Sequence, residues 1–172
     1  VHVEFFKDPE ELIAEKSKLA EALTEDGVLI LNHDDYAVLG MKDKTKARAV
    51  TFGIEPHADV KIANYTFIYT KDGSLGDVPE GIAFKLEFNG SVVPVKFRGT
   101  FGFPQAYAAA AAGGVGAALG MNLIEISEAL RDYVPPPGRL RLIKGIKHSF
   151  ILDDTYNAAP DAMRSALDTL RE

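Results

Sequence analysis

The stretch that decides the fold class reads GIAFKLEFNGSVVPVKF over residues 81–97. On both sides of Asn89-Gly90, apolar and polar residues alternate, which is the period of a half-buried β-strand. Asn-Gly between two such runs is the strongest short hairpin signal, because both residues tolerate the positive φ of a tight turn. The stretch therefore predicts two antiparallel strands joined by a two-residue turn.

Further runs extend this β layer towards the N-terminus. Residues 49–53 and 60–67 also resemble strands, so we expect a mostly antiparallel layer within residues 47–102. Residues 28–31 form a short, fully apolar run, which is typical of a buried parallel strand. The chain is therefore predicted to have an α/β fold with a short parallel edge beside the β layer.

Helices are expected around these strands. Asp8 is a good N-cap and Pro9 suits the first helical position, so a helix should begin there and end before Gly27. The triple proline at residues 135–137 is the best linker in the chain. The remaining expected elements are helices over residues 8–25, 104–119, 122–133 and 161–170, and a hairpin over residues 140–152.

Composition narrows the classes of function. The chain has 172 residues, of which 47% are hydrophobic and 26% charged, as in ordinary globular proteins. A net charge of -6 argues against nucleic acid or an anionic membrane as a partner. The chain lacks cysteine and any apolar run of about 18 residues, so we expect a cytoplasmic protein without disulfides. We also expect a monomer. Both ends fall inside structured-looking sequence, so we expect the chain to be a fragment.

Lys16 is the residue with the sharpest physical signal. At about 100° per residue it falls among Leu12, Leu19 and Leu23, on the expected apolar face of the first helix. A lysine on a buried face is costly unless it is paired or modified. Two interpretations stay open, a snorkelling or salt-bridged lysine and a desolvated lysine with altered chemistry.

A second group of side chains has the chemistry of a metal site. Its members are His2, Glu4, His33, Asp34 and Asp35. Imidazole and carboxylate groups suit magnesium or manganese only in a mixed, water-rich shell. The alternative is that the two aspartates after the strand only form a turn.

A polar turn and an arginine lie on either side of the last hairpin. Residues 153–160 combine two carboxylates, a hydroxyl, a phenol and an amide, which suits either turn formation or hydrogen bonds to a ribose. Arg139 follows the triple proline, where it could clamp a phosphate or be simply solvated. The chain has neither a Gly-x-x-x-x-Gly-Lys-Ser/Thr nor a Gly-x-Gly-x-x-Gly motif, so it has no phosphate cradle of its own.

Several motifs, in the same order, resemble those of the Mur ligase family. His2 precedes Lys16 by fourteen positions, as in the middle domain of the family, and residues 32–35 are similar to its strand-end Asn-x-Asp-Asp. Residues 138–140 resemble its junction with the C-terminal domain. Residues 151–163, ILDDTYNAAPDAM, resemble the Asp-Asp-Ser-Tyr-Asn-Ala-Asn-Pro-x-x-Met of the members that add D-alanyl-D-alanine. The resemblance covers nearly the whole chain.

The resemblance implies a division into two parts. Residues 1–137 would be a central domain of the ATP-binding type with an antiparallel β layer, lacking its phosphate loop. Residues 138–172 would begin a C-terminal α/β ligase domain. The phosphate loop should then lie upstream of Val1, and most of the C-terminal domain downstream of Glu172.

The resemblance also implies an ATP- and magnesium-dependent amide ligase of peptidoglycan synthesis. ATP would phosphorylate a carboxylate of a UDP-linked muramyl peptide, and the amine of D-alanyl-D-alanine would attack the acyl phosphate. His2 and a carbamylated Lys16 would be catalytic and would bind the metal. The residues expected to contact the nucleotide are Arg139, Asp154, Tyr156, Asn157, Gln105 and Asn32.

Departures from the family pattern leave alternatives open. Residues 101–106 stand where the family has His-Asn-x-x-Asn-Ala, whose asparagines contact adenine, and only Gln105 resembles one of them. Ala159 replaces another usual asparagine. The alternatives are a non-catalytic ligase-like binding module, or a sibling ligase that adds diaminopimelate, lysine or, as in the folylpolyglutamate type, glutamate. Without a phosphate loop, this chain alone is expected to be inactive.

Overall fold

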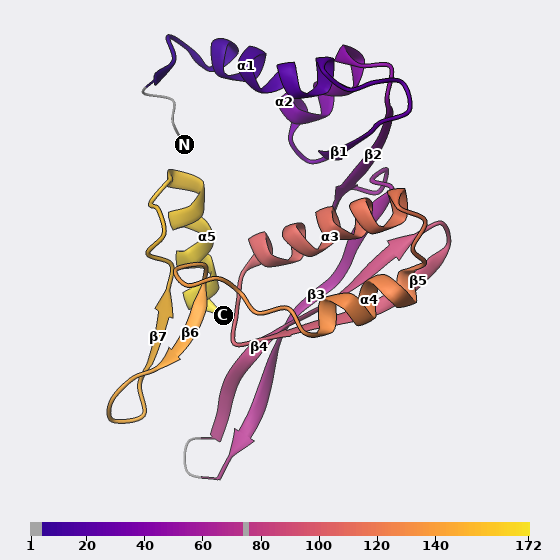
Figure 1. Ribbon diagram of the computed structural model, residues 1–172. Coiled ribbons are helices and arrows are strands. Elements are labelled where there is room, and N and C mark those ends of the chain that lie inside the picture. The colour runs from indigo at the N-terminus through magenta and orange to yellow at the C-terminus, as the bar shows by residue number, and fades with distance from the viewer. Residues whose placement is uncertain (1–4, 74–75) are drawn as a thin grey trace.

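The computed structural model describes residues 5–73 and 76–172, and the statements below concern those residues. It has a five-stranded sheet in the order β1-β2-β3-β4-β5 and a two-stranded sheet, β6-β7 (Figure 1). The strands are β1 (Val28–Asn32), β2 (Arg48–Gly53), β3 (Val60–Asp72), β4 (Gly76–Phe88), β5 (Ser91–Arg98), β6 (Arg141–Lys144) and β7 (Phe150–Asp153). The helices are α1 (Pro9–Glu21), α2 (Tyr36–Leu39), the 3-10 helix η2 (Gly40–Lys44), α3 (Phe103–Ala118), α4 (Leu123–Arg131) and α5 (Pro160–Arg171).

The predicted hairpin is confirmed. β4 and β5 pair antiparallel from Gly81 opposite Arg98 to Phe88 opposite Ser91. Asn89 and Gly90 form the turn with φ values of 48° and 75°, the left-handed conformation that a tight hairpin requires. The alternating apolar residues of both strands are buried, so the period seen in the sequence places one face of the hairpin in the core.

The parallel and antiparallel parts belong to one continuous sheet. β1 runs parallel to β2, and β2 runs parallel to β3. β2 and β3 overlap only at Phe52–Val60 and Gly53–Lys61, so β3 starts where β2 ends and runs on past it. A short loop therefore joins two parallel neighbours, which ordinarily need a long crossover. The predicted strand over residues 49–53 exists, but it belongs to the parallel part.

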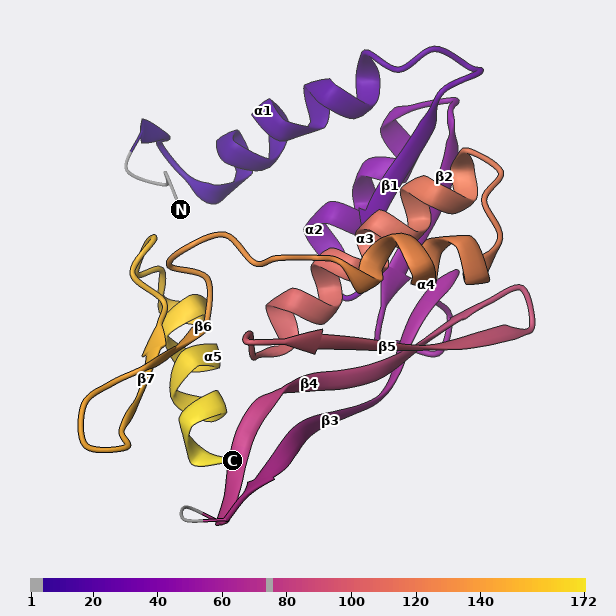
Figure 2. The same ribbon diagram turned by 60° about the horizontal axis from the view of Figure 1, so that its bottom comes forward.

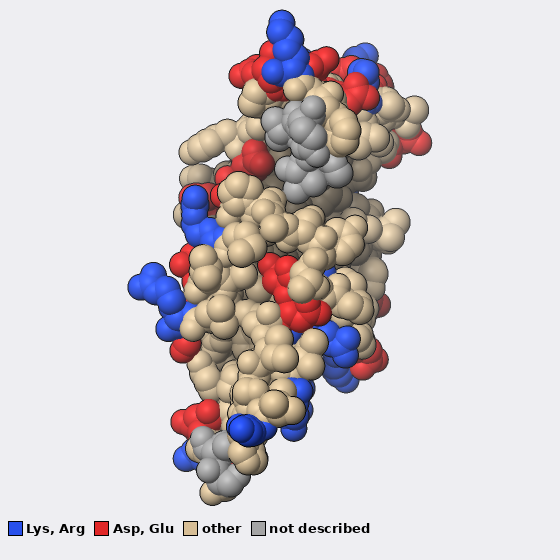
Figure 3. All heavy atoms as spheres, turned by 90° about the vertical axis from the view of Figure 1, so that its left-hand side faces the viewer, with Lys and Arg blue, Asp and Glu red and all other residues tan. Residues whose placement is uncertain are grey.

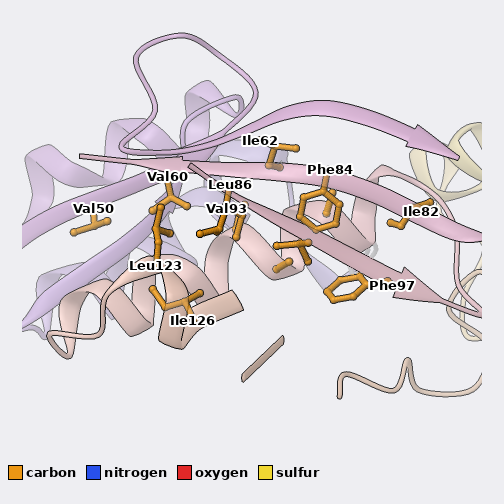
Figure 4. Close-up of a cluster of buried hydrophobic side chains, with 14 of the residues drawn as sticks. Val50, Val60, Ile62, Ile82, Phe84, Leu86, Val93, Phe97, Leu123 and Ile126 are labelled. Atoms are coloured by element: carbon orange, nitrogen blue, oxygen red, sulfur yellow. The ribbon is translucent and has the colours of Figure 1, made fainter. Parts of the chain in front are cut away.

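Helices α3 and α4 lie on the same face of the large sheet (Figures 1 and 2). Leu123 and Ile126 of α4 point towards sheet residues such as Val60 and Leu86 (Figure 4). Ala106, Ala109 and Ala110 of α3 are buried, and a Cβ on Gly114 would lie 3.1 Å from the Ile30 side chain. Small residues let α3 lie close to the sheet, as its alanine-rich sequence indicates.

The first helix shows a different face from the one expected. The buried residues of α1 are Ser17 and Ala20, whereas Lys16 is exposed and Leu19 is 75% exposed. The predicted burial of Lys16 is therefore wrong. Small side chains allow α1 to pack closely. The buried Ser17 hydroxyl donates a hydrogen bond to the Ile13 carbonyl at 2.8 Å. Packing selected the side of the helix with small residues instead of the leucines.

The C-terminal unit is the β6-β7 hairpin followed by α5, as the sequence predicts. It joins the large sheet through a bridge between Thr100 and Arg141, and the Leu142 amide donates to the Gly99 carbonyl at 3.0 Å. Helix α5 has no buried residue among those described. No helix in the described ranges has both the length and the apolar character needed to cross a membrane.

Candidate functional site

The linker before β6 and the turn after β7 fold back onto each other. The Gly138 amide donates to Asp153 Oδ2 at 3.1 Å, and the Tyr156 amide donates to the Gly138 carbonyl at 3.2 Å. Gly138 has a φ of 73°, and a Cβ there would lie 2.9 Å from the Tyr156 nitrogen. Only glycine combines this φ with so close an approach. The structure therefore brings two of the predicted segments together.

Arg139 and Tyr156 make direct contact at this junction. The guanidinium carbon of Arg139 lies 3.7 Å from the centroid of the Tyr156 ring, which is a cation–π contact. Tyr156 is 65% exposed and Arg139 is half-buried. Stacking uses the face of the guanidinium, while its N–H groups lie in the plane and remain able to donate to an anion. Asn157 follows Tyr156 in the same turn.

The two aspartates of the turn have different surroundings. Asp153 accepts hydrogen bonds from the Thr155 hydroxyl at 2.7 Å and from the Gly138 amide. The bond from Thr155, followed by those from backbone amides, lowers the pKa of the Asp153 carboxyl. Asp154 is half-buried and has no hydrogen bond or ion pair with any described residue. Asp153 thus holds the turn, and Asp154 keeps a carboxylate that can accept from a ligand.

Gln105 lies at the base of the same junction. Its amide nitrogen donates to the Arg139 carbonyl at 2.9 Å, and its amide oxygen accepts from the Tyr133 hydroxyl at 2.9 Å. The side chain is 5% exposed. The sequence suggests an adenine contact, but the structure places both polar atoms of this amide in contacts within the protein.

Asn32 lies apart from the junction. It is the last residue of β1 in the five-stranded sheet, whereas β6 and β7 form the separate two-stranded sheet. Its side-chain oxygen accepts from the Asp34 amide at 3.0 Å, which shapes the loop after the strand. The hydrogen bond of Asn32 is thus made within its own loop and not with Arg139 or Tyr156.

Asp34 is the centre of a cluster that the sequence did not reveal. Its carboxylate accepts from the amides of Ile54 and Glu55, at 2.8 and 3.1 Å, and from the Tyr107 hydroxyl at 2.7 Å. Burial, and then the hydrogen bond to Asp34, raise the pKa of Tyr107. A Cβ on Gly53 would lie 2.5 Å from this carboxylate. The signal available in the sequence was Tyr107, a large polar-tipped side chain within an alanine run.

The carboxylates that follow β1 bind donors from the protein. Asp34 is occupied by protein donors, and Asp35 caps α2 by accepting from the Ala37 and Val38 amides. No group of three or more histidine, aspartate or glutamate side chains within the described ranges could hold a metal ion. His2 and Glu4 lie outside the described residues. The magnesium site predicted from His2 and Lys16 includes a residue outside the described ranges, so it stays a prediction.

A cavity of about 680 Å³ lies between β3 and α5. Tyr65, Phe67 and Tyr69 of β3 and Phe103 of α3 line one side, and polar residues of α5 line the other. The rings of Tyr65 and Phe103 stack with their centroids 4.0 Å apart, and burial raises the pKa of Tyr65 to about 12. An aromatic wall can stack against a planar ring. These residues looked like ordinary strand residues in the sequence because they are spread over residues 65–103.

The distribution of surface charge does not by itself identify the candidate site. The face of the molecule that includes α1 carries acidic and basic side chains interspersed with uncharged ones (Figure 3). The contacts at Gly138, Arg139 and Tyr156 therefore identify the candidate site better than the surface charge does.

Comparison with known proteins gives consistent findings. Residues 1–113 match the Mur ligase middle domain. The chain is 29% identical over 172 residues to the UDP-N-acetylmuramoyl-tripeptide--D-alanyl-D-alanine ligase of Mycobacterium leprae, covering 98% of this chain and 33% of that protein. It is 26% identical over 171 residues to the UDP-N-acetylmuramate--L-alanine ligase of Aquifex aeolicus, covering 99% and 35%.

Solved structures show the same fold. MurF from Acinetobacter baumannii matches with a TM-score of 0.81 and 24% identity, over 99% of this chain and 35% of that one. The MurF ligase from Thermotoga maritima, in complex with ADP, matches with a TM-score of 0.80 and 23% identity, over 99% and 36%. The chain thus spans about a third of the length of these relatives.

Proposed function

Because this chain belongs to the Mur ligase family, we propose that it is part of an ATP-dependent amide ligase of peptidoglycan precursor synthesis. In this reaction ATP phosphorylates a substrate carboxylate, and an amine then displaces the phosphate to form an amide. The observation that supports the proposal is the junction, where Arg139 presents a cation and Asp154 a carboxylate that has no partner among the described residues. These are the groups needed for the phosphates and the ribose of a nucleotide.

Each residue of the junction has a proposed role. Arg139 donates to the phosphates, because its in-plane N–H groups are not used by the stacking on Tyr156. Asp154 accepts from the ribose hydroxyls, and Asn157 lies beside it. The aromatic wall with Tyr65 and Phe103 offers a stacking surface for the base in place of the missing asparagines.

The proposed substrates are a UDP-linked muramyl peptide and D-alanyl-D-alanine. Residues 151–163 support this choice, because they resemble the members of the family that add this dipeptide. A sibling ligase that adds L-alanine or diaminopimelate is the second candidate, since relatives with those names are 26% and 27% identical. We place the reaction in the cytoplasm, where ATP is available, and propose a monomer.

Lys16 keeps its proposed role as a carbamylated lysine, together with His2. Its amine is exposed on α1, so burial on a helix face does not support this role, which rests on the family resemblance alone. Magnesium, when bound, would stabilise negative charge on the phosphates. Among the described residues, no group of three or more histidine, aspartate or glutamate side chains could hold it.

Lys16 is tested in the intact ligase that contains this chain. Lys16→Ala is expected to abolish most ligation without unfolding the protein. Bicarbonate alone should not restore ligation, because no amine remains to form the carbamate, while a short carboxylic acid should restore part of it by supplying an anion. Normal turnover of Lys16→Ala would end this assignment.

The overall proposal is tested in the same intact protein. Phosphate release is measured with ATP, UDP-N-acetylmuramoyl tripeptide and D-alanyl-D-alanine, leaving out each substrate in turn. Asp154→Ala should raise the KM for ATP roughly tenfold, because a hydrogen bond to a charged group is lost. Val92→Ala, an exposed change on β5, is the matched control and should leave the KM unchanged. If no muramyl peptide stimulates phosphate release, the chain is a binding module and not a ligase.

A further inference from the structure

One buried side chain holds both ends of the triple-proline linker. Tyr133 lies just before the linker and donates its hydroxyl to the Gln105 amide oxygen at 2.9 Å. Arg139 lies just after it, and its carbonyl accepts from the Gln105 amide nitrogen at 2.9 Å. The amide of Gln105 thus closes a loop that contains residues 134–138. Both contacts are made inside the protein, since Gln105 is 5% exposed.

The linker itself is stiff. Prolines at positions 135–137 have φ restricted to about -65° and no backbone N–H. They cannot donate hydrogen bonds to neighbouring segments, so other groups must hold the linker in place. The ring of Tyr133 packs against Phe97 of the core with a centroid distance of 4.7 Å, which anchors the first end. Because the segment is stiff and both of its ends are held, the main chain that follows the prolines has a restricted direction.

The second end connects the two units of the molecule. The main chain of Arg139 is held by Gln105, and Thr100 donates its hydroxyl to the next carbonyl, that of Leu140, at 3.2 Å. The side chain of Arg139 lies on Tyr156, in the turn after β7. Burial raises the pKa of the Tyr133 phenol, and the positive charge of Arg139 opposes this rise. The Arg139 carbonyl thus accepts from the Gln105 amide at 2.9 Å and, at the longer distance of 3.4 Å, from the Thr100 hydroxyl.

We propose that Gln105 and Tyr133 are positioning residues that fix the direction of the Arg139 side chain over Tyr156. The role of Arg139 in binding nucleotide phosphates rests on the function proposed above. Gln105 acts through the Arg139 main chain and does not contact the nucleotide. Its length matters, because the amide must reach both Tyr133 and Arg139 from one position on α3.

The arrangement is tested by the NMR signal of the Arg139 Nε–Hε group in this chain. A proton held over a tyrosine ring is shifted upfield, and Tyr156→Leu provides the position of the signal without the ring. Gln105→Glu keeps the acceptor for Tyr133 but loses the donor to Arg139, so the signal should move most of the way to the Tyr156→Leu position. Tyr133→Phe removes only a hydroxyl and should move it a smaller distance in the same direction.

A core variant separates positioning from general stability. Val95→Ala removes buried apolar volume from β5 without touching the linker, so it should lower the unfolding midpoint and leave the Arg139 signal in place. Variants of Gln105 and Tyr133 that lower the midpoint like Val95→Ala but leave the Arg139 signal unmoved would overturn the proposal. Tyr133→Phe keeps this test available if Gln105→Glu does not fold.

Kinetics of the intact ligase extend the test. Gln105→Glu should raise the KM for ATP about tenfold and leave the KM for the muramyl peptide unchanged, because only the phosphate clamp is misdirected. An unchanged KM for ATP, in a wild-type enzyme that ligates, would contradict the positioning role. If the wild type does not ligate but the NMR signal moves as expected, the proposed function fails and the positioning of Arg139 stands.

Discussion

Asp34 and Asp35 lie just after β1, and Asp153 and Asp154 lie at the end of β7, so a pair of neighbouring carboxylates occurs at the ends of two strands in different sheets. At the end of β1, both are used by the protein. Asp34 accepts two backbone amides and the Tyr107 hydroxyl, and Asp35 caps α2. At the end of β7, Asp153 holds the turn while Asp154 has no partner among the described residues.

The difference follows from what lies beside each strand. β1 is next to β2, so the loop after β2 brings the Ile54 and Glu55 amides to Asp34, and α3 brings Tyr107. β7 pairs only with β6, and the linker amide of Gly138 is the donor that reaches it from outside the turn. A carboxylate is available to a ligand where the fold brings too few N–H or O–H donors to bind every carboxylate nearby.

The largest expected effect is on stability at the first pair. Asp34→Ala leaves three donors without their acceptor and should lower the free energy of unfolding by about 3 kcal/mol, at about 1 kcal/mol per hydrogen bond. Asp154→Ala, the matched change at the second pair, should alter it by less than about 0.5 kcal/mol. Urea unfolding measures both. Equal losses of stability would show that Asp34 and Asp154 contribute alike to the fold, which would contradict the comparison.

A smaller loss of stability is expected from substitution of Gly138, whose amide donates to Asp153 of the second pair. Gly138→Ala adds a Cβ 2.9 Å from the Tyr156 nitrogen at a φ of 73°, and should cost about 2 kcal/mol. Gly90→Ala is the control, because Gly90 has a φ of 75° with nothing within 4 Å of the added Cβ. It should cost about 1 kcal/mol, from the backbone conformation alone. If thermal unfolding shows the same loss for both, the turn with Tyr156 yields easily and does not fix the linker.

The phenol at the first pair should show its effect at alkaline pH. Tyr107→Phe should cost about 1 kcal/mol at neutral pH, for one hydrogen bond. The pKa of Tyr107 is raised in the folded protein, so its contribution is fully present below the unfolded value of about 10 and is lost as the pH rises through the folded value. The wild type should therefore lose stability above about pH 10, and Tyr107→Phe should lose less. Parallel stability curves for the two proteins would contradict this assignment.

The smallest expected effect compares the two aspartates of the second pair at acid pH. The pKa of Asp153 is lowered, so its contribution is present above the unfolded value of about 3.9 and is lost as the pH falls through the folded value. Asp153→Asn should flatten this acid limb of the stability curve. Asp154→Asn should retain it, because Asp154 has no such bonds. A flattened limb in Asp154→Asn would reverse the roles given to the two residues.

Local signals in the sequence were sufficient for most elements. Asn89-Gly90 specifies its own turn, Asp8 caps α1, and the alternation over residues 81–97 assigns one face to the core. Each of these depends on residues that are close in the chain, whose conformational preferences act without help from the rest of the molecule. The family resemblance likewise depended on short motifs and agrees with the match over residues 1–113.

The face of α1 could not be read in the same way. A stripe with Leu12, Lys16 and Leu19 and a stripe with Ser17 and Ala20 are both compatible with a helix, and hydrophobicity favours the first. The fold buries the second, because only small side chains allow α1 to lie against its partners. The choice depends on the shape of the neighbouring elements, which the helix's own residues do not contain.

For the candidate site, the sequence by itself determined which side chains are present and that Arg139 and the Asp154 turn flank one hairpin. Only the tertiary structure decided that, among the described residues, Asp153 has hydrogen-bond donors and Asp154 has none, and that Gln105 binds the main chain after the linker from inside the protein. The physical reason is that a polar side chain's role depends on which donors and acceptors from distant segments reach it. Those partners are brought within hydrogen-bond distance only when the chain has folded.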